Sequence, residues 1–266
     1  MTRFVTSADG TQIAYDRLGQ GAPLILVGGI FCDRTSTQSL AEKLARQFSV
    51  INYDRRGRGA SGDTPPYAVA REVEDLAALI AKVGEAAVYG HSSGAGLALN
   101  AAAGGLPISR LVLHEPPYGA DDDESTHAAR ELAENVRAAI AEDRRSDAIS
   151  LFFTGSGLPP EMVEGMSADP TMLAVAPTMP YDHEVMGDYR RGGTIPDDLV
   201  RAVTMPTLVI AGEASPEFFR DTAARIAALL PNGTLTMLEG QDHGAPAEVV
   251  APIVAAFVTA SLPEAR

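Results

Sequence analysis

The sequence contains no tryptophan and a single cysteine, Cys32, which excludes an internal disulfide and a cysteine-based zinc site. It has no uninterrupted apolar stretch long enough to span a bilayer, and residues 1–10 lack the apolar segment of a secretory signal. Its histidines are scattered, and no glycine-rich loop has the spacing of a P-loop or a dinucleotide-binding fingerprint. We therefore expect a cytoplasmic protein with no metal and no cofactor.

Positive charge is also scarce, because 21 lysines and arginines face 35 aspartates and glutamates, which gives a net charge of −14. An acidic surface of this kind argues against nucleic acid and against an anionic membrane as partners. The 266 residues suffice for one large domain with a substantial core, and 45% of them are hydrophobic, as in an ordinary globular protein. Whether the chain forms a homodimer is left open.

Apolar runs of strand type alternate with amphipathic helical segments along most of the chain. In the segment 71–83, for example, Val73, Leu76 and Ile80 fall on one helical face. Alternation of strand and helix is typical of an α/β protein with a mostly parallel sheet and helices on both faces. We expect strands at 4–6, 12–15, 23–27, 49–53, 86–89, 109–114, 207–211 and 234–238, and helices at 36–47, 71–83, 95–103, 125–142, 217–230 and 247–261.

The alternation breaks between residues 116 and 202, where only helical and loop signals occur. We interpret this stretch as a helical cap subdomain inserted into a core domain formed by residues 1–115 and 203–266. An insertion at this point would lie over the carboxyl ends of the strands, where α/β proteins place their sites.

The segment Gly90-His91-Ser92-Ser93-Gly94 is the strongest chemical signal in the chain. A strand-like run precedes it and a small-residue helix follows, so Ser92 is predicted to lie on a nucleophile elbow. The sharp turn exposes the serine hydroxyl, and the flanking glycines remove side chains that would collide there. The amino end of the following helix points free N–H groups at an oxyanion formed beside the serine.

A serine nucleophile needs a base, which in turn needs a carboxylate to orient it. His243 is the best candidate base, because it lies in a loop between the last predicted strand and the last helix, at the carboxyl edge of the sheet. The competing histidines are His91 inside the elbow, His114 at a strand end, and His127 and His183 in the insertion.

The elbow, His243 and the segment Asp54-Arg55-Arg56-Gly57-Arg58-Gly59-Ala60-Ser61 together resemble the α/β-hydrolase superfamily. The last segment is similar to the Asp-x-Arg-Gly-x-Gly-x-Ser signature of that superfamily. Its basic residues suggest phosphate binding, but we interpret them as structural, with arginine pairs and glycine turns holding a loop under the site. The resemblance implies an eight-stranded α/β-hydrolase fold with an inserted cap.

The acid of the triad is not at the position that the resemblance implies. Members of the superfamily usually carry it in the loop after the penultimate strand, three residues beyond a glycine, and that position is Ser215 here. Glu115 and Glu213 are the candidates. We favour Glu115, which directly follows the strand after the elbow and is stiffened by Pro116 and Pro117. Some members, including certain haloalkane dehalogenases, place their acid there.

The oxyanion hole requires two backbone N–H groups fixed where negative charge develops. The first is expected to be that of Ser93, the residue after the nucleophile. The second should come from the loop after Val27, which reads Gly28-Gly29-Ile30-Phe31. By resemblance to the His-Gly-x segment of the superfamily, Ile30 is the expected donor and Gly29 the alternative.

A closer resemblance is to the zearalenone-type lactone hydrolases. These have a Cys-Ser-Ser-Gly-Ala elbow and a His-Glu-x-Pro segment, which is similar to 114–117 of this chain, and the glutamate of that segment is their triad acid. A Thr-Pro-x-x-Phe-Phe-type stretch corresponds to 215–219. Their cap tryptophan, which holds the substrate ring, has no counterpart here, and Tyr189, Met186 or Tyr181 is expected to replace it.

We therefore expect a serine esterase or lactonase that acts on a small hydrophobic ester or lactone. Methionines and aromatic residues concentrate in the insertion and suit an apolar pocket, although each of them also fits a role in the core of the cap. The expected substrate-binding residues are Phe31, Phe153, Tyr181, Met186 and Tyr189. The alternatives are C–C hydrolysis or cofactor-free perhydrolysis on the same triad, and a receptor for hydrophobic ligands without turnover.

Overall fold

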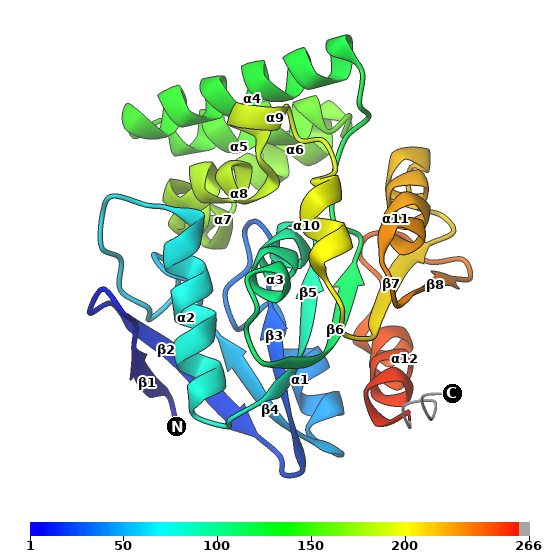
Figure 1. Cartoon of the computed structure of the whole chain (residues 1–266). Coiled ribbons are helices and arrows are strands. Elements are labelled where there is room, and N and C mark those ends of the chain that lie inside the picture. The colour runs from blue at the N-terminus through cyan, green and yellow to red at the C-terminus, as the bar shows by residue number, and fades with distance from the viewer. Residues whose placement is uncertain (261–266) are drawn as a thin grey trace.

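A computed structural model describes residues 1–260 of the protein, which form an eight-stranded sheet covered by helices (Figure 1). The strands are β1 (Arg3–Thr6), β2 (Gln12–Leu18), β3 (Ala22–Val27), β4 (Phe48–Tyr53), β5 (Ala86–His91), β6 (Ile108–His114), β7 (Thr207–Gly212) and β8 (Gly233–Leu238). Their order in the sheet is β1-β2-β4-β3-β5-β6-β7-β8. β2 pairs antiparallel with both of its neighbours, and all pairings from β4 to β8 are parallel. The predicted mostly parallel sheet is confirmed.

Helices cover both faces of this sheet (Figure 1). α1 (Gln38–Leu44) and α12 (Ala247–Thr259) lie on one face, and α2 (Val69–Ala81), α3 (Ser93–Ala103) and α11 (Glu217–Leu229) lie on the other. This arrangement places an apolar core on each side of the sheet.

Strand β3 shows why its sequence reads as one continuous apolar run. Leu24 and Leu26 point into the core beneath α1 and α12, whereas Ile25 and Val27 point into the core beneath α2 and α3. Side chains alternate along a strand, so a strand covered on both faces buries every residue.

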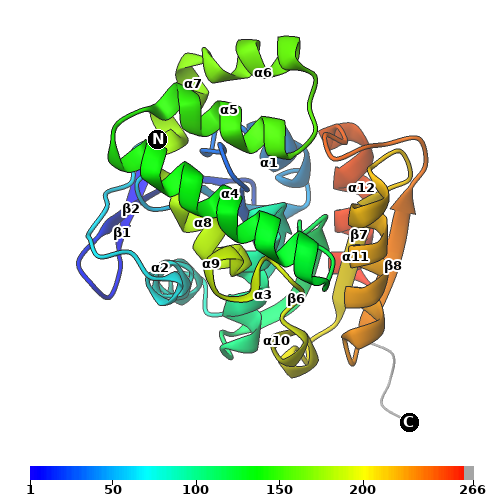
Figure 2. The same cartoon turned by 90° about the horizontal axis from the view of Figure 1, so that it is seen from above.

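The segment between β6 and β7 is helical, as the sequence predicts. It contains α4 (Asp123–Ala141), α5 (Arg145–Gly155), α6 (Pro160–Ser167), α7 (Pro170–Val175), the 3-10 helix η1 (Ala176–Thr178), α8 (Met179–Met186), α9 (Asp188–Arg191) and α10 (Asp197–Ala202). Helices α4 to α9 lie across the end of the sheet at which β5 and β6 terminate, and α10 runs beside α3 and α11 (Figures 1 and 2). Val136, Ile149 and Met179 belong to a separate apolar core within these helices.

Some helix boundaries differ from those that the sequence predicts. The helix expected to begin at Ser36 begins at Gln38, because the Asp33 carboxylate accepts hydrogen bonds from the backbone N–H groups of Thr35 and Ser36 and holds them in a turn. The helix expected at 71–83 is α2, which begins at Val69. The last helix ends at Thr259, and Ser261, its expected final residue, lies outside the described residues.

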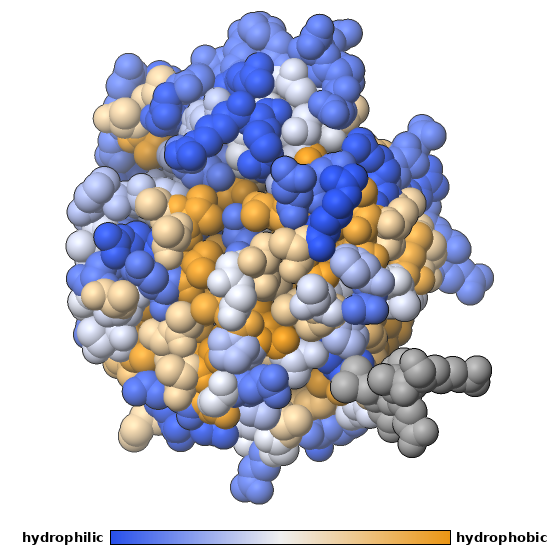
Figure 3. All heavy atoms as spheres, viewed as in Figure 1, coloured by the Kyte–Doolittle hydropathy of each residue, from blue (hydrophilic) through white to orange (hydrophobic). Residues whose placement is uncertain are grey.

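The surface of the insertion is hydrophilic, whereas apolar residues gather on the face below it, over α2, α3 and α10 (Figure 3). Across residues 1–260, every helix is too short or too polar to traverse a lipid bilayer.

Helix α3 approaches β3 so closely that its first turn requires glycine. A Cβ added at Gly94 would lie 2.4 Å from the Val27 carbonyl oxygen and 2.6 Å from that of Gly28. Both neighbours are backbone atoms of a central strand and its following loop, and neither can move aside. In contrast, a Cβ at Gly165 in α6 would meet nothing within 4 Å.

The same substitution in these two helices should therefore have opposite effects. We expect Gly94→Ala to lower the free energy of unfolding by about 1–3 kcal/mol or more through overpacking. Gly165→Ala should raise it by about 0.5–1 kcal/mol, because alanine favours the helix over the unfolded chain. Urea unfolding of both variants measures this difference. A Gly94→Ala protein as stable as wild type would show that the close approach is wrong.

Candidate active site

Ser92 occupies a strained turn between β5 and α3. Its backbone has φ 55° and ψ −130°, a conformation that non-glycine residues adopt only when their surroundings enforce it. The Ser92 N–H donates a hydrogen bond to the His114 carbonyl at 2.9 Å, which anchors the turn to β6. Gly29 lies directly against Ser92, since a Cβ added at Gly29 would be 2.8 Å from the Ser92 Cβ. The predicted elbow geometry is present.

His243 lies in the loop between β8 and α12, next to the elbow. Its imidazole ring stacks between His91, the residue before Ser92, and Phe219 at the start of α11, with a centroid separation of 4.6 Å on each side. His91 Nε2 also contacts the His243 carbonyl oxygen at 3.1 Å. Burial, together with the nearby His243, lowers the pKa of His91 to about 4, so His91 is a neutral ring in this stack.

Glu115 is the carboxylate that contacts this imidazole. Its Oε2 lies 2.6 Å from His243 Nδ1, and its Oε1 accepts hydrogen bonds from the Gly212 N–H at 2.7 Å and the Ser215 hydroxyl at 2.6 Å. Glu115 is fully buried and has a positive φ of 46°, which turns it away from the line of β6. Glu213, the other candidate, is an exposed residue beyond β7.

The electrostatics of Glu115 favour the ionised form. Burial alone would raise its pKa, but the hydrogen bonds from His243, Ser215 and Gly212 outweigh burial and hold the pKa below its ordinary value. A carboxylate at Nδ1 fixes the imidazole proton on that nitrogen and leaves Nε2 free to act as a base.

Ser215 has a role that the sequence did not reveal. It stands at the position where the superfamily resemblance predicts the acid, and its hydroxyl instead donates to the Glu115 carboxylate, which extends from the end of β6. A hydroxyl at that position is the one signal in the sequence that could have indicated a relocated acid. The sequence indicated His91 only as a competing base and gave no sign of Phe219, although the His243 imidazole stacks against both rings.

The loop after β3 also borders the serine, through Gly29. The Cys32 N–H donates to the Gly29 carbonyl at 3.2 Å and closes a turn in which Phe31 has a φ of 60°. Ser93 is the first residue of α3, so its N–H has no acceptor within the helix. Gly29 and Ser93, two of the three expected oxyanion donors, are therefore adjacent to Ser92, and Ile30 follows Gly29 in the same loop.

Two of the five expected substrate-binding residues, Phe31 of this loop and Phe153 of α5, contact each other. The Phe31 ring stacks on Phe153 with centroids 5.3 Å apart and meets the edge of Phe152 at 5.6 Å. Phe31 and Ile30 also pack against the core of the insertion. An apolar, aromatic surface therefore links the loop after β3 to helix α5.

The other three expected residues are directed elsewhere, and this part of the prediction needs correction. Met186 is 4% exposed and packs on α3 in the main core, where its sulfur would lie 2.8 Å from a Cβ added at Gly96. Tyr181 stacks on Tyr67 at 3.8 Å and donates its hydroxyl to Asp63. Tyr189 lies under the Arg137 guanidinium and donates its hydroxyl to the Ala133 carbonyl of α4. All three stabilise the packing of α8 and α9 onto their neighbours.

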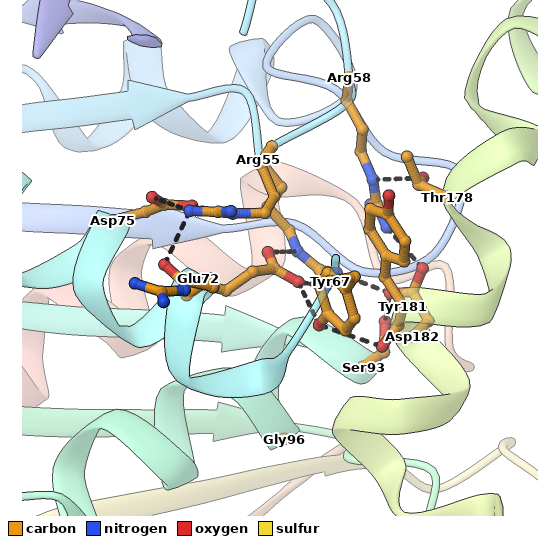
Figure 4. A network of polar contacts seen from close by, with 12 residues as sticks. Arg55, Arg58, Tyr67, Glu72, Asp75, Ser93, Gly96, Thr178, Tyr181 and Asp182 are labelled. Atoms are coloured by element: carbon orange, nitrogen blue, oxygen red, sulfur yellow. Dashed lines mark hydrogen bonds and ion pairs between the residues drawn. The ribbon is translucent and has the colours of Figure 1, made fainter. Parts of the chain in front are cut away.

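The arginines of the 54–61 segment are buried and paired with carboxylates, in agreement with a structural role (Figure 4). Arg55 contacts Glu72 and Asp182, Arg56 contacts Asp75 and Asp9, and Arg58 contacts Asp182. These acidic partners were not identified from the sequence, because they lie on α2, on α8 and in the β1–β2 turn.

The depressed pKa of Glu115 predicts a pH-dependent contribution to stability. Its ordinary pKa is 4.5 and its folded value is lower, so this stabilisation is complete above that pH and is lost as the pH falls through the folded pKa. The stability difference between wild type and Glu115→Gln should therefore shrink when the pH is lowered from about 6 to about 3. Urea unfolding at a series of pH values measures it.

Glu213→Gln is the matched control, because Glu213 is exposed and its substitution should produce no such trend. A pH-independent difference for Glu115→Gln would contradict an ionised, hydrogen-bonded Glu115.

Comparisons with known proteins identify the family of the chain. The model of the alpha/beta hydrolase family matches residues 24–256. The chain is similar to an alpha/beta hydrolase from Sphaerobacter thermophilus, whose crystal structure superposes with a TM-score of 0.87 at 48% identity and covers 97% of this chain and 100% of the other.

Two curated relatives have assigned activities. A non-heme chloroperoxidase from Streptomyces lividans is 29% identical over 96% of this chain and 98% of its own length. An N-formylmaleamate deformylase from Pseudomonas putida is 39% identical, but the match spans only 42% of this chain and 44% of the deformylase. The fold, the elbow and the family match agree, and the chain belongs to the alpha/beta hydrolase family.

Proposed function

We propose that the protein is a serine hydrolase that cleaves a neutral, apolar carboxylic ester or lactone through an acyl-serine intermediate. The observation that carries this proposal is the buried Glu115 carboxylate, which is hydrogen-bonded to His243 Nδ1 beside the strained Ser92 elbow. A family match alone supports hydrolysis in general. The ester or lactone substrate rests on the character of the surrounding side chains.

The proposed reaction assigns one step to each of these groups. His243 Nε2 takes the proton of the Ser92 hydroxyl as its oxygen attacks the carbonyl carbon. Glu115 stabilises the imidazolium that forms, and the N–H groups of Ser93 and of Ile30 or Gly29 bind the oxyanion. The imidazolium then protonates the leaving alkoxide. A water molecule, deprotonated by the same base, attacks the acyl-serine and releases the acid.

The charges near the site support a neutral substrate. Arg55 and Arg58 are buried next to the loop after β3, but both are engaged by carboxylates. Phe31, Phe152 and Phe153 provide an apolar surface beside that loop. A substrate carboxylate would lose its hydration there, and these two arginines, already paired with carboxylates, would not compensate for the loss. A zearalenone-like macrolactone fits this chemistry and belongs among the substrates to be tested.

A second candidate is perhydrolysis, in which hydrogen peroxide replaces water in the attack on the acyl-serine. The similarity to proteins named non-heme haloperoxidase and non-heme chloroperoxidase, over most of their lengths, favours it. Both candidates share the acylation step and differ only in the second nucleophile. Product analysis of an ester reaction with and without peroxide separates them.

Ser92→Ala tests the proposal. Purified protein mixed with an activated aryl ester should release a burst of one phenolate per active site, followed by steady turnover. Ser92→Ala should abolish the burst and lower kcat by about 10⁶-fold, because the loss of a triad nucleophile removes nearly all of the catalysis. A panel of alkyl esters, aryl esters and macrolactones then identifies the substrate class.

Ser156→Ala is the control, since Ser156 lies on the exposed surface of the insertion. Wild-type protein that binds these compounds without turnover would indicate a receptor. A Ser92→Ala variant with full activity would rule out the acyl-serine.

A further inference from the structure

One buried polar cluster contacts the two peptides that carry the Gly29 and Ile30 N–H groups, and it includes Ser93, the third candidate oxyanion donor. The cluster consists of Arg55, Arg58, Asp182 and Ser93, and we call it the Asp182 cluster (Figure 4). Its members come from the 54–61 segment, from the start of α3 and from helix α8 of the insertion. Each member is almost completely buried, so these polar contacts are not shared with bulk water.

Arg58 fixes the orientation of the peptide that carries the Ile30 N–H. Its Nη1 donates to the Gly29 carbonyl at 2.6 Å and to the Cys32 carbonyl at 3.1 Å. The Gly29 carbonyl and the Ile30 N–H belong to one planar trans peptide, so they point in opposite directions. The guanidinium that holds the carbonyl therefore also aims the N–H. Its positive charge further polarises this peptide and strengthens the donor.

Arg55 acts in the same way on the preceding peptide. Its Nη1 lies 3.4 Å from the Gly28 carbonyl oxygen, and that peptide carries the Gly29 N–H, the alternative donor. Glu72 holds the Arg55 guanidinium in place by two hydrogen bonds of 2.7 Å. The two arginines thus hold the two consecutive peptides from which the second oxyanion donor must come.

Asp182 connects both arginines to the third donor. Its Oδ1 accepts hydrogen bonds from Arg55 at 2.6 Å and from the Ser93 hydroxyl at 2.7 Å, and its Oδ2 contacts Arg58 at 2.5 Å. Burial would raise the pKa of Asp182, but the charges of Arg55 and Arg58 and the Ser93 hydroxyl hold it below its ordinary value. An ionised side chain from the insertion thus restrains the Ser93 residue whose N–H is the first donor.

We infer that the Asp182 cluster positions the oxyanion hole, with Arg58 as the main positioning residue and Asp182 as the link that makes the geometry of the hole depend on the docking of helix α8. This inference rests on the proposed function, because it assigns these residues to the stabilisation of an oxyanion during acyl transfer. None of the four side chains is a catalytic residue in the strict sense, since they act through the backbone N–H groups of Gly29, Ile30 and Ser93.

Arg56 provides an internal comparison. It lies in the same segment, is as buried as Arg58, and forms hydrogen bonds with Asp75, Asp9 and the Arg71 carbonyl. These partners tie the segment to α2 and to the β1–β2 turn, away from the loop after β3. A purely structural role of buried arginines in this segment would therefore make Arg56 and Arg58 equivalent.

The test compares Arg58→Lys with Arg56→Lys. Lysine keeps the positive charge but loses the fork that contacts two acceptors at once. Active sites are counted by titration with a fluorophosphonate, and kcat, KM and the inhibition constant of a trifluoromethyl ketone are then measured per active site. The ketone forms a tetrahedral adduct whose oxyanion occupies the hole, whereas KM for a short ester depends little on the hole.

We expect Arg58→Lys to lower kcat and the affinity for the ketone by a similar factor, about 10- to 100-fold, because complete loss of one oxyanion donor costs about 10²–10³-fold. KM should stay close to the wild-type value. Arg56→Lys should lower the thermal unfolding midpoint to a similar extent but leave kcat and ketone affinity unchanged. Ser93→Ala, which removes only the contact with Asp182, should shift kcat and ketone affinity in the same direction and serves if Arg58→Lys does not fold.

The possible failures are distinct. If wild type hydrolyses no ester in the panel, the proposed function is wrong and this inference with it. If wild type is active and Arg58→Lys and Ser93→Ala keep wild-type kcat and ketone affinity, only the positioning role is wrong. Equal losses in Arg56→Lys and Arg58→Lys would also overturn it, since both arginines would then act through stability alone.

Discussion

The buried carboxylate of Glu115 links the ends of β6 and β7 to the loop after β8, which carries His243. It extends from the end of β6, accepts hydrogen bonds from Gly212 at the end of β7 and from Ser215 beyond it, and contacts His243 from the loop after β8. Hydrogen bonds to a charged group are each worth about 1.5–3 kcal/mol, and a buried charge that loses its partners is strongly destabilising. The loop that carries the imidazole is therefore fixed by the same contacts that keep this carboxylate ionised.

A second buried charge, on Asp182, connects the insertion to the core. Its two arginine partners come from the 54–61 segment and its serine partner from the elbow helix, so the insertion does not rest on the core through apolar contacts alone. The two carboxylates contact different parts of the candidate site. Glu115 is linked to the base, and Asp182 is linked to the segments that carry the candidate oxyanion donors.

The sequence predicted the order of strands and helices along the chain, the elbow, and the proximity of Glu115 to His243. These features depend on local pattern and on position relative to strand ends. It did not predict the partners of the arginines. Arg55 and Asp182 are separated by 127 positions, and nothing in the local pattern of α8 distinguishes a buried aspartate from a surface one. The assignment of Met186, Tyr181 and Tyr189 to a pocket failed for a related reason. An apolar or aromatic residue on a helix can face a ligand, a neighbouring helix or the main core, and only tertiary packing decides among them.

The most direct test of the account is a comparison of Glu115→Gln with Glu213→Gln in ester hydrolysis. Glutamine preserves the shape, and its carbonyl oxygen can still accept from Gly212 and Ser215. Its amide group, however, favours the wrong imidazole tautomer at His243. We expect kcat to fall by about 10⁴-fold in Glu115→Gln, as for other triad carboxylates, and to stay unchanged in Glu213→Gln. Full activity in Glu115→Gln, or a large loss in Glu213→Gln, would contradict the assignment of Glu115 as the acid.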